Sequence, residues 1–164
     1  MKIIISDTGP LIALAKTNNL YILQQLFSKI IIPDSVLKEL QLGSTKAGTN
    51  ALHKAIFIDK WIEVSQEEVR PPSRISNVLD PGEAEAIVLA NKLNLILLID
   101  ERRGRTVAKQ ELIEVIGTAG LLLLAKRKKI IPEVKKVLID IQNCGYRFAD
   151  KLLMTILQLA EEDE

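Results

Sequence analysis

Four acidic side chains from separate parts of the chain are the residues best placed to do chemistry. Asp7 and Asp100 each directly follow a short run of Ile and Leu. Glu39 borders the apolar stripe of a predicted helix, and Glu83 lies in the first turn of another. Oxygen ligands from separate segments suit a hard cation such as Mg²⁺ or Mn²⁺. The pattern favours metal-assisted hydrolysis of a phosphodiester, because such an ion activates water and neutralises charge on the leaving oxygen.

Each of these acids also has a purely structural interpretation. Asp7 or Asp100 alone could end a strand or cap a helix, and a single helical Glu such as Glu39 usually keeps its head in water. The string from Asp80 to Glu83 is typical of a capping box, which would explain Glu83 without any function. Two acids at equivalent strand ends shift the balance toward a site, since clustered carboxylates repel one another unless a cation lies between them.

Residues beside the four acids are secondary candidates. They are two further acids and three hydroxyl side chains: Glu85, Glu101, Ser6, Thr8 and Thr118. Two roles are open to Thr118 and could hold at once: it could cap the helix that follows it, and it could face a phosphate at that helix N-terminus.

A run of cations follows Asp100 and could bind a polyanionic substrate. Its members are Arg102, Arg103, Arg105 and Lys109, and a second basic run covers residues 126–129. Either run could be an ordinary solvated helix face, but the first begins at the predicted site. Aromatic residues make up only 4% of the chain, so contacts to phosphates rather than base stacking would supply most of the affinity.

Composition excludes several classes of protein. The 164 residues include one Cys and one His, which excludes a disulfide scaffold, a Cys-rich zinc site and catalysis by paired histidines. The net charge of +1 gives no global basicity that would indicate a nucleic-acid partner. No apolar run approaches the roughly 20 residues of a membrane span, and no signal peptide is evident. We expect a cytoplasmic protein with no membrane partner.

Short apolar segments alternate with helical periodicity, which predicts an α/β protein with a mostly parallel central sheet between helical layers. The predicted strands are 3–5, 30–32, 61–64, 95–99 and 114–116. The predicted helices are 11–15, 20–27, 35–42, 46–56, 82–93, 102–112, 121–128, 132–142 and 148–160. Pro132 is expected in a first helical turn, Gly145 at a helix stop, and residues 66–77 in a surface loop. We expect a single domain over residues 1–164, with 130–164 as its helical C-terminal extension.

Five motifs in order resemble those of the PIN-domain nucleases, and most closely the prokaryotic branch related to VapC-type toxins. They are 6–12, 32–39, 79–87, 98–101 and 115–118. The resemblance implies a Rossmann-like α/β/α sandwich and a metal-dependent endoribonuclease. It implies that Mg²⁺ or Mn²⁺ is held by four acids that also position the attacking water: Asp7, Glu39, Glu83 and Asp100. It also implies a small antitoxin as partner and a homodimer.

The chain departs from the VapC-type pattern in two places. The third acid is Glu83, with Glu85 as a rival for the position, where those toxins commonly have Asp. Residues 130–164 are predicted as helices instead of a final strand. The alternative function is a non-catalytic PIN-like module that binds RNA or a protein partner, and metal affinity at the acids would discriminate the two. The string Asp7-Thr8-Gly9 also occurs in aspartic proteases, but the helical spacing opposes their β-rich fold. Neither a Walker-type loop nor GxGxxG follows the first strand, which disfavours nucleotide-binding enzymes.

Overall fold

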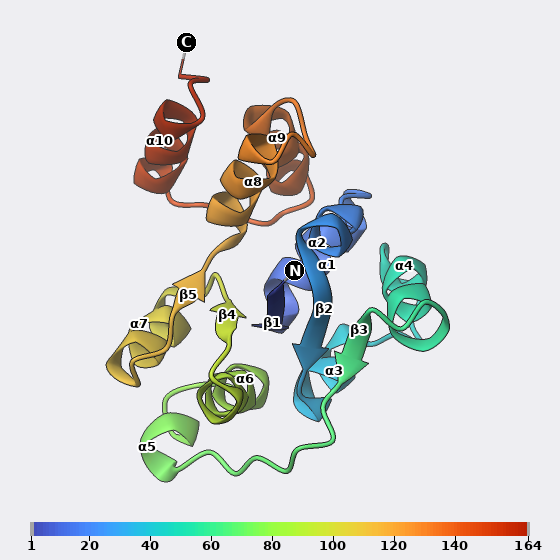
Figure 1. Cartoon of the computed structure of the whole chain (residues 1–164), viewed down its shortest axis with the longest axis vertical. Helices are drawn as coiled ribbons and strands as arrows, with labels where there is room; N and C mark the ends of the chain where they lie inside the picture. Colours follow the sequence, from blue (N-terminus) through green and yellow to red (C-terminus); the bar gives the residue numbers. More distant parts are fainter. Residues whose placement is uncertain (1, 164) are drawn as a thin grey trace.

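Five short parallel strands form one sheet through the middle of the molecule (Figure 1). The computed structural model describes residues 2–163. In spatial order the strands are β3 (Ile62–Val64), β2 (Phe27–Ile32), β1 (Lys2–Ser6), β4 (Ile96–Leu98) and β5 (Val115–Ile116). The predicted parallel α/β architecture is therefore confirmed.

Helices cover both faces of this sheet, because successive strand residues point to opposite sides. Ile4 and Ile5 are both fully buried, and each belongs to a different apolar cluster. Ile4 packs in the larger cluster with α1 (Thr8–Lys16), α2 (Tyr21–Leu26), α3 (Asp34–Leu40), α4 (Thr49–His53), α8 (Thr118–Arg127), α9 (Val134–Asn143) and α10 (Asp150–Leu159). Ile5 packs in the smaller cluster with α5 (Ser73–Ser76), α6 (Pro81–Leu93) and α7 (Arg102–Gln110). Within residues 2–163, no helix combines the length and apolar character needed to cross a membrane.

The order of the strands creates a crevice between β1 and β4. From β1 the chain proceeds outward through β2 and β3, and then returns to the other side of β1 for β4 and β5. Ser6 pairs with Leu98 at the carboxyl ends of the two central strands. Ligands of open parallel sheets bind at such a switch point, beyond the carboxyl ends of the strands. This edge is where the acids after β1 and β4 were predicted to meet.

Several predicted boundaries differ from the structure. The predicted helix 20–27 ends at Leu26, because Phe27 pairs with Lys2 and begins β2. The predicted helix 46–56 begins only at Thr49, since Gly48 has a left-handed backbone with φ of 87°. It then continues as the π-helix η1 (Lys54–Ile58).

Two further predictions differ from the structure, and one is confirmed. Pro132 precedes the first turn of α9, which begins at Val134, and the carboxylate of Glu162 accepts the N–H groups of Val134 and Lys135 there. The predicted loop 66–77 contains the short helix α5. Gly145 follows α9 with φ of 91°, so the predicted helix stop is confirmed.

Candidate active site

The four predicted acids line one cavity at the carboxyl edge of the sheet. The cavity has a volume of about 230 Å³, and Asp7, Glu39, Glu83 and Asp100 all contribute to its wall. They come from the end of β1, from α3, from the first turn of α6 and from the segment after β4. Three other side chains with acidic or phenolic oxygens line it too: Asp80, Glu101 and Tyr146.

Asp7 lies at the crevice between the two central strands. Its backbone N–H donates to the carbonyl oxygen of Leu98 at 3.0 Å, and its side chain is only 7% exposed. The adjacent Ser6 hydroxyl donates to the backbone carbonyl of Asp7 at 2.9 Å. The pairing of β1 with β4 therefore fixes this carboxylate at the switch point.

Glu39 reaches the cavity from α3 because two donors hold its carboxylate there. The Thr8 hydroxyl donates to Oε2 at 2.6 Å, and the Gly82 N–H donates to Oε1 at 3.2 Å. A Cβ atom at Gly82 would lie 2.6 Å from both carboxylate oxygens of Glu39. The absence of a side chain at this position thus allows the first turn of α6 to approach α3.

Asp100 is bound by three donors. The Thr118 N–H donates to Oδ1 at 2.7 Å, the Thr118 hydroxyl donates to Oδ2 at 2.5 Å, and the Tyr146 hydroxyl also donates to Oδ2. A carboxylate offers about four acceptor positions, so roughly one remains. Gly117 is the N-cap of α8, so the predicted cap at Thr118 is wrong. The Thr118 side chain instead faces the acid.

Glu83 combines a helix-start position with a place in the cavity. Asp80 accepts the Glu83 N–H at 2.8 Å and caps α6, which confirms the predicted cap. The Glu83 side chain nevertheless lines the cavity, together with that of Asp80. On the neighbouring α7, a Cβ atom at Gly104 would lie 3.3 Å from Glu83 Oε2, so α7 packs closely against this carboxylate.

Burial and mutual repulsion perturb the ionisation of the site. The pKa of Asp7 is raised to about 7, chiefly by burial and in smaller part by the charges of Asp80, Glu39 and Asp100, while a hydrogen bond from the Thr8 N–H opposes the rise. Burial, a hydrogen bond with Asp80 and nearby negative charges raise the pKa of Glu83 to about 8. Clustered carboxylates with raised pKa values are relieved when a cation binds among them.

The donor set fits a hard divalent cation, because it consists of carboxylate and hydroxyl oxygens. Within residues 2–163, no group of three or more His, Cys, Asp or Glu side chains is arranged so that it could hold a metal ion as it stands. Hydrogen bonds to Thr8, Gly82, Thr118 and Tyr146 occupy much of the acceptor capacity of Glu39 and Asp100. The acids nearest to accepting an ion are therefore Asp7 and Glu83.

The secondary candidates divide between the cavity and other places. Thr8 and Glu101 line the cavity, whereas Glu85 does not. Arg103 lies apart from the acids, and its guanidinium donates to the Val78 carbonyl at 3.4 Å. Arg105 lies closer, and it donates to the carbonyl of Ile99, directly before Asp100, at 3.0 Å.

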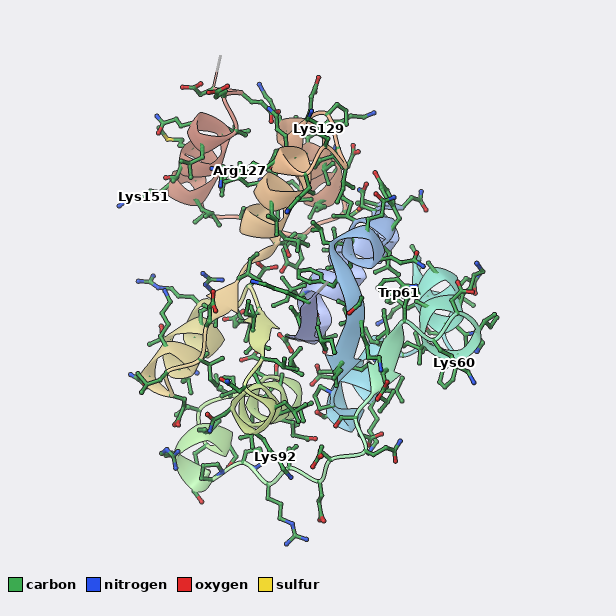
Figure 2. The ribbon with its side chains drawn as sticks, viewed as in Figure 1. Lys60, Trp61, Lys92, Arg127, Lys129 and Lys151 are labelled. Carbon is green, nitrogen blue, oxygen red and sulfur yellow. The ribbon has the colours of Figure 1, made fainter. Side chains whose placement is uncertain are left out.

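The second basic run lies at the far end of α8 from Thr118. Lys126 pairs with Glu162 at 2.9 Å, and Figure 2 shows Arg127 and Lys129 among the C-terminal helices. The ten residues of α8 span about 15 Å, which separates this run from the acids.

Sequence reasoning missed Tyr146 as a site residue and treated Asp80 only as a cap. Tyr146 lies 46 residues after Asp100, in the connection between α9 and α10, where no periodicity or motif indicates a role. For Asp80 a signal did exist, since it lies three residues before Glu83 at the same helix start.

The profile of a family described as PIN domain matches residues 3–162. No curated protein matches the chain. Among solved structures, the chain is similar to a PilT N-terminus domain protein from the hyperthermophilic archaeon Sulfolobus solfataricus. The two are 20% identical with a TM-score of 0.42, over 74% of this chain and 90% of the other. Because the family profile spans nearly every residue, the five strands and the acids at their carboxyl edge belong to a member of the PIN-domain family.

Proposed function

We propose that this chain is a Mg²⁺- or Mn²⁺-dependent endoribonuclease that hydrolyses RNA phosphodiester bonds. The observation that carries the proposal is the convergence of Asp7, Glu39, Glu83 and Asp100 on one cavity of about 230 Å³ at the switch point of the sheet. The raised pKa of Asp7 supports it, because a bound cation would offset both the burial of this carboxylate, which is the main cause of the rise, and the smaller repulsion from neighbouring acids.

The four acids would surround the metal ion, with Asp7 and Glu83 as its principal ligands because hydrogen bonds already occupy much of Glu39 and Asp100. When bound, such an ion lowers the pKa of a coordinated water and neutralises charge on the phosphate. The chain's own residues prepare the site for this chemistry. Thr118 and Tyr146 orient Asp100, and Thr8 orients Glu39, so that two carboxylates are fixed before substrate arrives.

Cleavage of a labelled RNA of mixed sequence tests the proposal. Purified wild-type protein should cut it with Mn²⁺ or Mg²⁺ and stop when chelator is added. Asp7→Asn should abolish cutting, which excludes a contaminating nuclease, and Glu85→Gln should cut as the wild type does because Glu85 does not line the cavity. Cutting that survives both chelator and Asp7→Asn would contradict the proposal.

We further propose that the chain is the toxin of a toxin–antitoxin pair, acting as a cytoplasmic homodimer that a small antitoxin protein blocks. The order of the five motifs, which resembles that of VapC-type toxins, supports this role. Expression in a bacterial host should arrest growth, and Asp7→Asn should remove the arrest. Light scattering of the purified protein should give twice the mass of the 18.3 kDa chain. Growth without arrest would contradict the toxin role, and a monomeric mass would contradict the homodimer.

One observation favours a second candidate, a non-catalytic PIN-like module that binds RNA or a protein partner. Thr118 and Tyr146 already fill three acceptor positions on Asp100, as they would in a scaffold that holds no ion. This module would show neither metal affinity nor cleavage. The nuclease binds Mn²⁺ through Asp7, so a metal titration separates the two.

A further inference from the structure

A second hollow adjoins the acid cavity. It lies between α7 and the segment that connects α9 to α10, has a volume of about 620 Å³, and is called the α7–α10 groove here. The groove and the acid cavity share three lining residues, Asp100, Glu101 and Tyr146. An extended polymeric ligand bound in the groove would therefore reach the acids without leaving the protein surface.

Basic side chains line the α7–α10 groove from both walls. Arg102, Arg105 and Lys109 come from α7, where spacings of three and four residues place them on one helix face. Arg147 comes from the opposite wall. Among residues 2–163, none of these four cations forms an ion pair with a carboxylate. These four cations outnumber the two acids that line the groove, Asp100 and Glu101, and this excess of positive charge favours a polyanion as its ligand.

Contacts on both sides of Arg147 hold it in this wall. The preceding residue, Tyr146, donates its hydroxyl to Asp100, and the following residue, Phe148, is only 9% exposed. The two rings also contact each other edge to face, with centroids 5.4 Å apart. The connection is thereby anchored to the acid site, and the exposed Arg147 side chain is left beside the groove.

We propose that the α7–α10 groove binds the phosphate backbone of a single RNA strand beside the bond to be cut, with Arg147 as a substrate-binding residue. The inference rests on the proposed function for the identity of the polyanion. It assigns the C-terminal segment part of the substrate site, and it leaves Arg103 and residues 126–129 outside that site. Tyr146 marks the junction at which the strand passes from the groove to the acids.

Binding without cleavage tests this site. The anisotropy of a fluorescent single-stranded RNA is titrated in chelator with full-length wild type, Arg147→Gln, Lys109→Gln and the control Lys129→Gln. The control removes the same charge from an exposed position just after α8, which ends at Arg127 (Figure 2). We expect Arg147→Gln and Lys109→Gln each to weaken binding by about threefold to tenfold at low salt. Each should reduce the slope of log K against log salt by about 0.7, whereas Lys129→Gln should change neither.

Three results would overturn the inference: no RNA binding by the wild type, wild-type affinity in Arg147→Gln, or an equal loss in Lys129→Gln. Arg147→Lys keeps the charge and should retain most of the affinity, which separates charge loss from misfolding. The nuclease proposal fails in a different way. RNA binding that depends on Arg147, without any cleavage in Mn²⁺, would support the groove and refute the nuclease. Metal-dependent cleavage that is unchanged in Arg147→Gln would support the nuclease and refute the role of the groove.

Discussion

Replacing Asp7 by Asn should stabilise the fold at alkaline pH. The side chain is 7% exposed, and burial raises its pKa from 3.8 to about 7. Between pH 3.8 and about pH 7, the Asp7 side chain therefore keeps a proton in the folded protein that it has lost in the unfolded chain. Stability from this group is therefore greatest at low pH, falls as the pH rises through this window, and is lowest above pH 7. Asn is neutral and of similar shape, so it avoids the buried charge.

The size of this effect follows from the pKa values. A rise of about three pKa units, at about 1.36 kcal/mol each, corresponds to at most about 4 kcal/mol at pH 8. For a domain of this length, about 3 °C per kcal/mol gives a melting temperature up to about 10 °C higher in Asp7→Asn. At pH 5 the solution is only about one pH unit above the pKa of Asp7 in the unfolded chain. The difference in the free energy of unfolding between Asp7→Asn and the wild type should therefore shrink to about 1–2 kcal/mol.

Thermal unfolding followed by circular dichroism at pH 5 and pH 8, in chelator, measures this difference. Glu85→Gln is the control, because it removes an acid on α6 that does not line the cavity. Adding Mn²⁺ at pH 8 should then raise the melting temperature of the wild type but not of Asp7→Asn. The reasoning is refuted if Asp7→Asn is less stable than the wild type at pH 8, or if the difference is the same at both pH values.

Three other substitutions give expected outcomes. Tyr146→Phe removes one donor from Asp100 and should lower the Kd for Mn²⁺ severalfold in a calorimetric titration, because an acceptor position on Oδ2 is freed. Gly82→Ala should displace the Glu39 carboxylate and reduce RNA cleavage at least tenfold, because the new Cβ would lie 2.6 Å from both oxygens. Glu162→Gln should destabilise the fold by about 1 kcal/mol in urea unfolding at pH 7, since it weakens the cap of α9. Burial opposes ionisation of Glu162, but hydrogen bonds from Lys135, Lys126 and Val134 hold its pKa below 4.5, so this stabilisation is present above pH 4.5 and lost as the pH falls.

Each of these outcomes has a result that would contradict it. A Kd for Mn²⁺ that rises in Tyr146→Phe would mean that the hydroxyl helps to hold the ion. Gly43→Ala is the control for Gly82→Ala, because nothing lies within 4 Å of a Cβ atom at Gly43. Equal cleavage by the two variants would show that the position of Glu39 does not matter. Unchanged urea unfolding in Glu162→Gln would show that its contacts add nothing to stability.

The strand-end acids could be predicted because their placement depends on local pattern. A short apolar run that ends in Asp marks the carboxyl end of a buried strand, and parallel strands bring such ends to one edge. The sequence pattern alone therefore predicts that Asp7 and Asp100 lie together. Glu83 was ambiguous from sequence, since a residue at a helix start can belong both to a cap and to a cavity. The structure shows it contributing to both.

The rest of the site depends on contacts between distant parts of the chain. Tyr146 reaches Asp100, and Arg147 reaches the neighbouring groove, because α9 and α10 pack beside α8, which neither periodicity nor composition indicates. Thr118 is similar: its sequence context is typical of a helix cap, but the adjacent Gly117 takes that role and Asp100 takes the hydroxyl. Phe27 continues the apolar pattern of the preceding helix in the sequence, and only its pairing with Lys2 shows that it belongs to a strand.

Binding of Mn²⁺ at pH 8, followed by the loss of its free electron paramagnetic resonance signal, tests the central claim most directly. The claim is that the acid cavity holds a divalent cation through Asp7 and Glu83. We expect the wild type and Glu85→Gln to bind the ion equally, and Asp7→Asn and Glu83→Gln each to lose at least tenfold in affinity. Equal Mn²⁺ binding by the wild type and Asp7→Asn would contradict the claim.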